Sequence, residues 1–377
     1  MRWLLSLLLL MTPARADDFV SSRAAFGAIM DYESGDLLWA KRADEAMPPA
    51  SMSKLMVVAV VLDLIERGTI SPDTPFDVSE KAWRTGGSKM FVLVDTQITV
   101  ENLLRGIVAT SGNDACVVVA ENVAGSTEGF VALMNAKAEE WGLAESRFAN
   151  VTGLPDPQQR MSARDLAALA RRLWERHPDH RYLFSIREFT WSDIRQGNRN
   201  PLLSTFEGAL GMKTGHTDES GYSLVGLAER DGRTRILVLQ GLESEAARRR
   251  EADRMMRVAF DEYHTHSFAA AGDVIAEAPV FAGRAATVPL TLGTDLRFTL
   301  HERSLDGAEA SIEYPSPLPA PIKAGEQVGV LRLAMPGEPE REYPLYAKDG
   351  VKALGARAKI GLGLKRLLTP PDAEVFE

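Results

Sequence analysis

The sequence predicts an α/β domain in which helices pack on one antiparallel sheet, followed by a smaller all-β domain. Two groups of strand-like segments lie near the ends of the first 264 residues, and a block of helical segments separates them. This order is typical of an α/β layer arrangement. After about His264 the chain changes to short apolar runs separated by Pro and Gly, which is typical of an all-β domain. A length of 377 residues suits two domains.

The first strands and the first helix follow from local patterns. Apolar runs at 26–31 and 37–40 flank the turn residues 33–36, which predicts a hairpin. Residues 51–67 contain no helix breaker, and the segment 55–62 is apolar on every face. A helix that is apolar all round is a buried one, so we expect this helix at the centre of the domain.

The remaining elements are predicted from periodicity and turn residues. Helices are expected at 100–124, 129–141, 162–176 and 246–263. Strands are expected at 222–229 and 235–239, on either side of the turn Asp231-Gly232. In the second domain, strands are expected at 287–292, 296–300, 310–314 and 328–335.

The N-terminus has the features of a secretory signal peptide. Arg2 precedes a short apolar run at 3–11, and Ala14-Arg15-Ala16 has the small-x-small form of a cleavage site. The run is too short to span a bilayer as a helix. We therefore expect a signal peptide at 1–16, an α/β domain at 17–264, a β-rich domain at 265–350 and a separate tail at 351–377.

Composition excludes several function classes. A formal net charge of -9 argues against nucleic-acid binding. Cys116 is the single cysteine, which rules out an internal disulfide, and its apolar neighbours predict a buried thiol. His264 and His266 are too close in sequence for a zinc signature, so neither a metal nor an organic cofactor is expected.

Chemistry is indicated first by Ser51 and Lys54, which lie three residues apart at the start of the apolar helix. Residues at this spacing share one helix face. A serine hydroxyl is a weak nucleophile until a neighbouring base takes its proton. Burial lowers the pKa of a lysine, as does a nearby positive charge, and we expect Lys213 to supply that charge. The backbone N–H of Ser51, at a helix N-terminus, can face a developing oxyanion.

Two further motifs complete a recognised set. Ser111-Gly112-Asn113 lies on a turn, where Ser111 can relay a proton and Asn113 can bind a carbonyl or orient the lysine. Lys213-Thr214-Gly215 precedes a strand; its Lys and Thr can bind a carboxylate, and Gly215 leaves room for a substrate. The N–H of His216 offers a second oxyanion donor. Together, S-x-x-K, S-x-N and K-T-G in this order are the signature of class A β-lactamases and penicillin-binding proteins.

These three segments, together with 161–166 and 194–200, resemble the low-molecular-mass penicillin-binding proteins, specifically the D-alanyl-D-alanine carboxypeptidases of peptidase family S11. The resemblance covers nearly the whole chain. It implies a serine β-lactamase/penicillin-binding-like catalytic fold and a periplasmic enzyme that removes the terminal D-alanine from peptidoglycan stem peptides and is acylated by β-lactams. By spacing, Arg248 matches the family position that binds the substrate carboxylate, although Arg249 is adjacent. Thr152 stands where many relatives have a histidine.

Three alternatives stay open at this point. A β-lactamase needs rapid deacylation, and the sequence has no Glu-x-x-Leu-Asn segment for a class A water-activating glutamate. A D,D-endopeptidase would accept cross-linked peptides. A non-enzymatic peptidoglycan-binding scaffold would not need the intact motifs.

The C-terminal tail predicts contact with the inner-membrane surface. Between residues 351 and 369 it carries five basic residues and no acidic ones, with a broad apolar face. This pattern is typical of an interfacial helix, and the related carboxypeptidases often end in an amphipathic anchor. Three glycines in the stretch argue the other way, and a soluble helix or tail packed on the β domain is the alternative.

Overall fold

The computed structural model describes residues 19–335 and 340–355. Within it the chain divides into two compact units, and the division falls between Tyr263 and His264. The expected signal peptide at 1–16 and nearly all of the expected tail at 351–377 lie outside the described residues, so both stay predictions.

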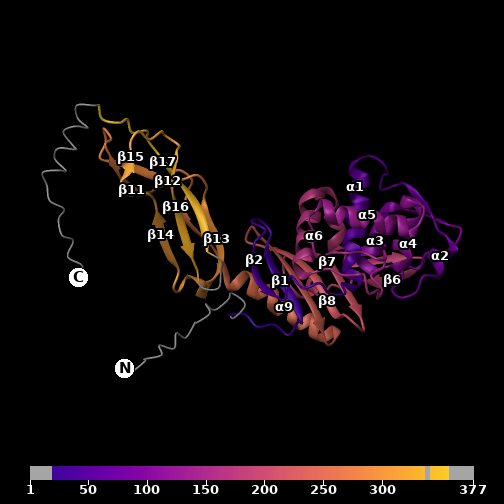
Figure 1. Ribbon diagram of the computed structural model, residues 1–377. Helices are drawn as coiled ribbons and strands as arrows, with labels where there is room; N and C mark the ends of the chain where they lie inside the picture. Colours follow the sequence, from indigo (N-terminus) through magenta and orange to yellow (C-terminus); the bar gives the residue numbers. More distant parts are fainter. Residues whose placement is uncertain (1–18, 336–339, 356–377) are drawn as a thin grey trace, which may run out of the picture. The chain divides into compact units, whose positions relative to one another are not determined.

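A five-stranded antiparallel sheet lies at the centre of the first unit, as the sequence predicts (Figure 1). Its order is β2-β1-β9-β8-β7, so the first two strands of the chain pair with the last three of this unit. The strands are β1 (Phe26–Asp31), β2 (Leu37–Lys41), β7 (Ala209–Thr217), β8 (Gly221–Arg230) and β9 (Arg233–Leu242). β7 is an edge strand, so one of its sides has no strand partner in this sheet.

Side-chain alternation along the strands builds a core on each face of this sheet. Along β9, Ile236 and Val238 belong to one hydrophobic cluster, whereas Leu237 and Leu239 belong to the other. Successive residues of a strand point to opposite faces, so one apolar run serves both cores. The larger cluster contains side chains from most of the helices, and the smaller one contains the buried apolar side chains of α9 (Glu245–Asp261).

The central helix is α1 (Lys54–Glu66), preceded by the 3₁₀ turn η2 (Ala50–Ser53). Every residue from Lys54 to Asp63 is buried, which confirms the prediction made from its uniformly apolar surface. The other helices of this unit are α2 (Glu80–Arg84), α3 (Val100–Arg105), η3 (Gly106–Thr110), α4 (Asn113–Ala124), α5 (Thr127–Glu140), α6 (Ala163–Arg176), η4 (Pro178–His180), α7 (Tyr182–Ser185) and α8 (Leu202–Thr205). Two small hairpins complete it, β3 (Pro75–Asp77) with β4 (Gln97–Thr99) and β5 (Glu188–Trp191) with β6 (Ile194–Gly197).

The second unit is built from β-strands, with one short 3₁₀ turn, η5 (Glu302–Leu305), among its described residues. Six strands form a sheet of order β14-β16-β17-β12-β11-β15, and β10 pairs with β13. The strands are β10 (Tyr263–Ala269), β11 (Val274–Phe281), β12 (Thr287–Leu292), β13 (Leu296–His301), β14 (Glu309–Glu313), β15 (Leu318–Pro319), β16 (Gln327–Ala334) and β17 (Arg341–Ala347). The unit has its own buried cluster, which includes Leu290 and Leu345.

Within residues 19–335 and 340–355, no single helix has both the length and the apolar composition needed to cross a bilayer. α4 and α5, which meet at an angle of 86°, reach that threshold only when they are taken together.

Glu251 of α9 ties the first described residues of the chain to the sheet unit. Its carboxylate accepts hydrogen bonds from the Ser22 hydroxyl (2.8 Å), the Arg23 N–H (3.0 Å) and the Arg254 guanidinium (2.7 Å). Burial raises the pKa of Glu251, but these hydrogen bonds outweigh it and bring the pKa down from 4.5 to about 2. The carboxylate therefore stabilises the fold in its charged form.

We expect Glu251→Ala to lower the free energy of unfolding by about 2 kcal/mol at neutral pH, because three donors lose a charged acceptor that is itself buried. A depressed pKa gives a contribution that is complete above pH 4.5 and disappears as the pH falls towards about 2. Urea unfolding of both proteins at neutral and acidic pH measures this. Asp253→Ala, which removes the surface pair with Arg257, is the control and should cost little. An equal loss in the two variants, or a loss that does not shrink in acid, would contradict the prediction.

Candidate active site

Ser51 and Lys54 lie on one face at the start of the central helix, as their spacing predicts. Ser51 belongs to η2 and is half-buried, whereas Lys54 opens α1 and is fully buried. Lys54 Nζ lies 2.6 Å from Ser51 Oγ, and it also donates to the backbone carbonyl of Thr152. Thr152 thus contacts the lysine through its main chain. The geometry is that of a nucleophile beside its base.

Burial is the largest cause of a lowered pKa at Lys54, which falls to about 8. The positive charge of Arg199 lowers the pKa further, while the negative charge of Asp114 opposes the shift. The expectation that Lys213 supplies this positive charge stays a prediction, because the repulsion between the two lysines appears in the lowered pKa of Lys213. The ammonium of Lys213 is itself strongly destabilised, since burial and the nearby Lys54 hold its pKa well below the usual value. A lysine with a pKa near 8 is neutral in a useful fraction of molecules at neutral pH, as a general base must be.

Two glycines allow the turn that carries Ser51 to pack tightly. Gly153 has a φ of +77°, and a Cβ there would lie 2.2 Å from the backbone oxygen of Ala50. A Cβ on Gly215 of β7 would lie 3.1 Å from the Ala50 side chain and 3.2 Å from Met52. Both glycines therefore serve the close approach of the chain to η2. The sequence analysis expects Gly215 to leave space for a substrate. In the structure, the missing side chain of Gly215 also leaves space for the turn η2.

The Ser111-Gly112-Asn113 motif interrupts a run of helix, as the sequence predicts. Residues 100–124 form α3, then a π-helical turn η3 (Gly106–Thr110), then α4, and the chain turns between the last two. Ser111 is buried there and has a left-handed φ of 62°. Asn113 starts α4; its Nδ2 donates to the carbonyl of Gly86 (2.8 Å), and its N–H donates to that of Ser88 (2.8 Å).

Asn113 is also the motif residue with a free acceptor. Its Oδ1 is buried and has no hydrogen-bond partner among the residues that the structure describes. Since its amide nitrogen is held by Gly86, the orientation of the side chain is fixed. A buried amide oxygen without a partner is expected to bind a donor from a ligand or from Lys54.

Lys213, Thr214 and Gly215 lie inside the edge strand β7, rather than ahead of a strand as the sequence analysis expects. Thr214 pairs with Leu224, and Gly215 pairs with Ser223, in the β7–β8 ladder. The strand was missed because its motif residues are polar and two glycines interrupt it. Lys213 is 2% exposed, and its Nζ donates to the carbonyl of Thr214 (3.1 Å).

Arg248 is buried, whereas Arg249 is exposed, which separates the two adjacent candidates for the carboxylate site. The Arg248 guanidinium lies 5.6 Å from the centre of the Tyr222 ring, and that ring lies 3.9 Å from the ring of His216. It donates to the carbonyl of Arg199 (3.3 Å), but its Nε is buried without a hydrogen-bond partner within the described chain. An unpaired buried N–H on a cation can receive an anionic ligand.

Arg199 is the functional candidate that sequence reasoning missed. It lies in the segment 194–200 that carries the family resemblance, yet no motif assigns it a role. Its guanidinium donates to the Ser88 hydroxyl (2.6 Å), and its charge lowers the pKa of both Lys54 and Lys213. The sequence signal that could have pointed to Arg199 was its place in segment 194–200, which carries part of the family resemblance. Sequence spacing alone does not connect that segment to Ser51.

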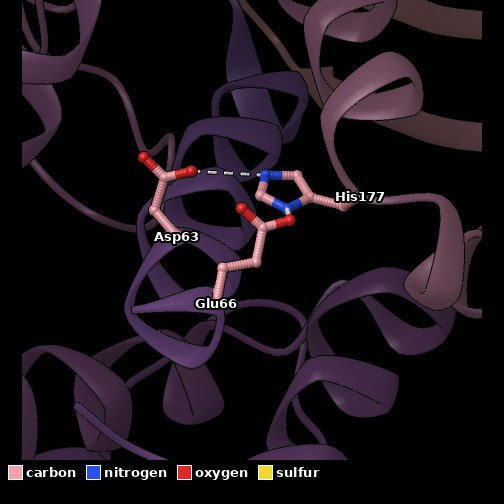
Figure 2. Close-up of side chains that lie close together, drawn as sticks. All are labelled: Asp63, Glu66 and His177. Atoms are coloured by element: carbon pink, nitrogen blue, oxygen red, sulfur yellow. Dashed lines mark hydrogen bonds and ion pairs between the residues drawn. The ribbon is translucent and has the colours of Figure 1, made fainter. Parts of the chain in front are cut away.

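A second cluster of titratable groups lies at the other end of α1 (Figure 2). Asp63, Glu66 and His177 place three potential ligand atoms within 4.8 Å of one another, although their sequence spacing has no metal signature. His177 Nδ1 lies 2.6 Å from Glu66, and His177 Nε2 lies 3.4 Å from Asp63. Lys137 already pairs with Asp63, and Arg176 is 4.0 Å from the same carboxylate. Protein cations thus balance the Asp63 carboxylate, and the cluster joins the end of α1 to the end of α6.

Comparisons with known proteins identify the family of each part of the chain. Residues 12–243 match the family described as D-alanyl-D-alanine carboxypeptidase, and residues 263–353 match the family described as penicillin-binding protein 5, C-terminal domain. The D-alanyl-D-alanine carboxypeptidase DacC of Escherichia coli is 34% identical over 335 residues, which covers 87% of this chain and 84% of DacC.

Solved structures give the same result. The D-alanyl-D-alanine carboxypeptidase DacD of Francisella tularensis has a TM-score of 0.79 and 30% identity, covering 92% of this chain and 96% of that one. Penicillin-binding protein D2 of Listeria monocytogenes, solved with ampicillin bound, has a TM-score of 0.59 and 27% identity, covering 64% of this chain and 99% of that one.

These findings bear out the fold and the activity that the motifs predict. The alternatives left open by the sequence, a β-lactamase, an endopeptidase or a non-enzymatic scaffold, are not favoured. The chain belongs to the D-alanyl-D-alanine carboxypeptidase family and is a serine-type hydrolase of that specificity.

Proposed function

We propose that this carboxypeptidase removes the terminal D-alanine of peptidoglycan stem peptides through an acyl-enzyme on Ser51. The observation that carries this proposal is the 2.6 Å separation of Lys54 Nζ and Ser51 Oγ at the buried start of α1. Lys54, neutral when its pKa is near 8, takes the hydroxyl proton as Ser51 attacks the carbonyl of the penultimate D-alanine. An ester to Ser51 forms, and the amide bond to the last residue breaks.

The leaving amine needs a proton, and we assign its transfer to Ser111, which is buried beside Asn113 at the start of α4. Water then attacks the ester, the Ser51 hydroxyl is restored, and the shortened peptide leaves. The backbone N–H groups of Ser51 and His216 are our proposed oxyanion donors, and Asn113 is proposed to bind the substrate's amide. All of these steps are carried by the protein's own residues.

Lys213, Thr214 and Arg248 are the proposed carboxylate site. A free carboxylate distinguishes the end of a peptide from an internal bond, and a buried group of cations suits it. Burial, Lys54 and Arg199 lower the pKa of Lys213, so an arriving anion would stabilise its charged form. The unpartnered Nε of Arg248 supports the same reading.

We expect Arg248→Ala to lower kcat/KM on a D-alanine-terminated peptide by about 10-fold to 100-fold, since a charged hydrogen bond contributes roughly 1.5–3 kcal/mol. Arg249→Ala, one residue along the same helix and exposed, is the matched control and should have little effect. Steady-state kinetics on the peptide and on its C-terminal amide measure the contact. Equal small effects at both positions, or an equal loss on the amide, would remove Arg248 from the carboxylate site.

Mass spectrometry of the protein after incubation with penicillin and with a pentapeptide tests the proposed function. We expect one covalent penicillin adduct that maps to the peptide containing Ser51, and a pentapeptide product shorter by one alanine. An adduct on another residue, or an unchanged pentapeptide, would contradict the proposal. Rapid release of intact enzyme with hydrolysed penicillin would instead indicate a β-lactamase.

We further propose that the enzyme acts in the periplasm, on the outer surface of the inner membrane. A signal peptide ending at Ala16 and a basic, apolar tail support this location, and both lie almost wholly beyond the described residues. Anionic lipid attracts basic residues at roughly 1 kcal/mol each near the surface.

Liposome flotation tests the anchor. We expect the mature chain to float with anionic vesicles at low salt and a chain ending at Gly350 to stay behind, because the truncation removes the basic and apolar stretch. Neutral vesicles and high salt serve as controls and should weaken flotation. If both chains remain equally in solution with anionic vesicles, the tail is not an anchor.

A further inference from the structure

A buried carboxylate beside the catalytic motif binds a neighbouring loop through three consecutive backbone N–H groups. Asp114 directly follows the Ser111-Gly112-Asn113 motif and is 1% exposed. Its Oδ1 accepts from the N–H of Met90 (2.8 Å), and its Oδ2 accepts from those of Phe91 (2.8 Å) and Val92 (3.2 Å). Hydrogen bonds to an ionised carboxylate are among the stronger ones in proteins.

The loop needs this support, because its backbone is strained at the point of contact. Phe91 has a φ of 74°, in the left-handed region that bulky side chains rarely adopt. Phe91 is 40% exposed, so burial of this residue does not explain its conformation. Two glycines give the loop its position, since a Cβ on Gly106 would lie 2.3 Å from the Met90 sulfur and one on Gly112 would lie 3.1 Å from the Met90 nitrogen. The middle residue of the motif is therefore small because Met90 packs against it.

Residues 86–88 of the same loop contact the active site, and they lie just before residues 90–92, which Asp114 binds. The carbonyl of Gly86 accepts from Asn113 Nδ2 (2.8 Å). Ser88 accepts from the N–H of Asn113 (2.8 Å) through its carbonyl and from Arg199 (2.6 Å) through its hydroxyl. The orientation of the Asn113 amide and the position of the Arg199 charge thus depend on where residues 86–88 lie.

We infer that Asp114 is a positioning residue for acylation: by clamping residues 90–92 it holds Gly86 and Ser88 against Asn113 and Arg199. The inference rests on the acyl-enzyme chemistry proposed above. Asp114 acts through the loop and not by contact with the reacting atoms. Its negative charge adds a second effect, because it raises the pKa of Lys54 against the opposing effects of burial and of Arg199. Cys116 also faces Lys54, and Lys213 is the other titratable neighbour.

The test compares Asp114→Asn with Asp165→Asn in the full mature chain. Asp165 is a matched control, since it is also buried and accepts from a backbone N–H, that of Glu145 (2.9 Å), and from the Ser146 hydroxyl. Two quantities are measured: amide hydrogen exchange at residues 90–92, and the second-order rate of acylation by penicillin from about pH 6 to about pH 10. Thermal unfolding shows whether the two variants lose similar stability.

We expect Asp114→Asn to speed exchange at residues 90–92 and to lower the acylation rate roughly 10-fold at its plateau, while Asp165→Asn leaves both near the wild-type values. The acidic limb of the pH profile should also move to lower pH by about half a unit, because the charge that favours the Lys54 ammonium is gone. General loss of stability would not move the limb in this direction.

Other outcomes overturn the inference without ambiguity. If exchange rises in Asp114→Asn but rate and pH profile match those of Asp165→Asn, the clamp is structural only and the inference is wrong. If wild-type protein gives no adduct on Ser51, the proposed function fails instead. Should Asp114→Asn not fold, Asp114→Ser and the wild-type exchange data remain decisive, since rapid wild-type exchange at residues 90–92 would contradict a clamp.

Discussion

Ser51→Ala is expected to abolish covalent labelling by penicillin while the protein stays folded. The side chain is half-buried, and the contact that it loses is the one with Lys54 Nζ. Removing a hydroxyl at such a position changes the free energy of unfolding by less than about 1 kcal/mol. No acyl-enzyme can form, so peptide hydrolysis should fall by several orders of magnitude. Mass spectrometry of the intact protein measures the adduct, and a thermal unfolding curve measures the fold.

Ser53→Ala provides the matched control for this experiment. Ser53 lies in the same 3₁₀ turn, is fully buried, and its hydroxyl donates to the carbonyl of Ala50 (2.9 Å). This variant should retain the penicillin adduct although it loses a buried hydrogen bond. A persistent adduct on Ser51→Ala, or loss of the adduct in both variants, would show that the nucleophile has been misassigned.

The fold was predictable where one residue pattern determines one element. The apolar run 55–62 allowed a single interpretation, a buried helix, and α1 is that helix. Strands β8 and β9 were expected from their apolar runs and the turn at Asp231-Gly232. Strand β7 was not expected. Its motif residues are polar because the chemistry of the site needs them, so they do not show the alternation of apolar and polar residues that predicts a strand. In the second unit, strands β10, β11, β15 and β17 were not expected. β11 and β17 each contain a proline, which usually argues against a strand, although β12 was expected despite Pro289.

Some residues of the site were also predictable from the sequence, and others were not. Ser51 and Lys54 could be paired from sequence because three residues along a helix fix which side chains meet. Arg199 and Asp114 could not, since their effects depend on a loop 86–92 that reaches them from a distant part of the sequence. The distinction between Arg248 and Arg249 also needed the structure, because only the rotation of α9 decides which of two adjacent arginines is buried.

Lys54 is expected to determine the acidic limb of the pH profile for acylation. A base must be neutral to accept the Ser51 proton, and burial lowers the pKa of Lys54 to about 8. In wild-type protein the rate should therefore rise with pH and level off above about pH 8. Lys54→Met, which has a similar volume and no titrating group, should lower the rate by roughly 10²–10⁴-fold and remove this limb. The measurement is the second-order rate of acylation by penicillin across pH.

Two further variants separate the base from its neighbours. Lys213→Ala should weaken acylation without moving the limb, since the added positive charge that lowers the pKa of Lys54 belongs to Arg199. Arg199→Gln should move the limb to higher pH, because removing a positive neighbour favours the Lys54 ammonium. If Lys54→Met retains a limb near pH 8, another group is the base, and the close contact of Lys54 with Ser51 is structural. If the limb moves in Lys213→Ala and not in Arg199→Gln, Lys213 is the charged neighbour after all.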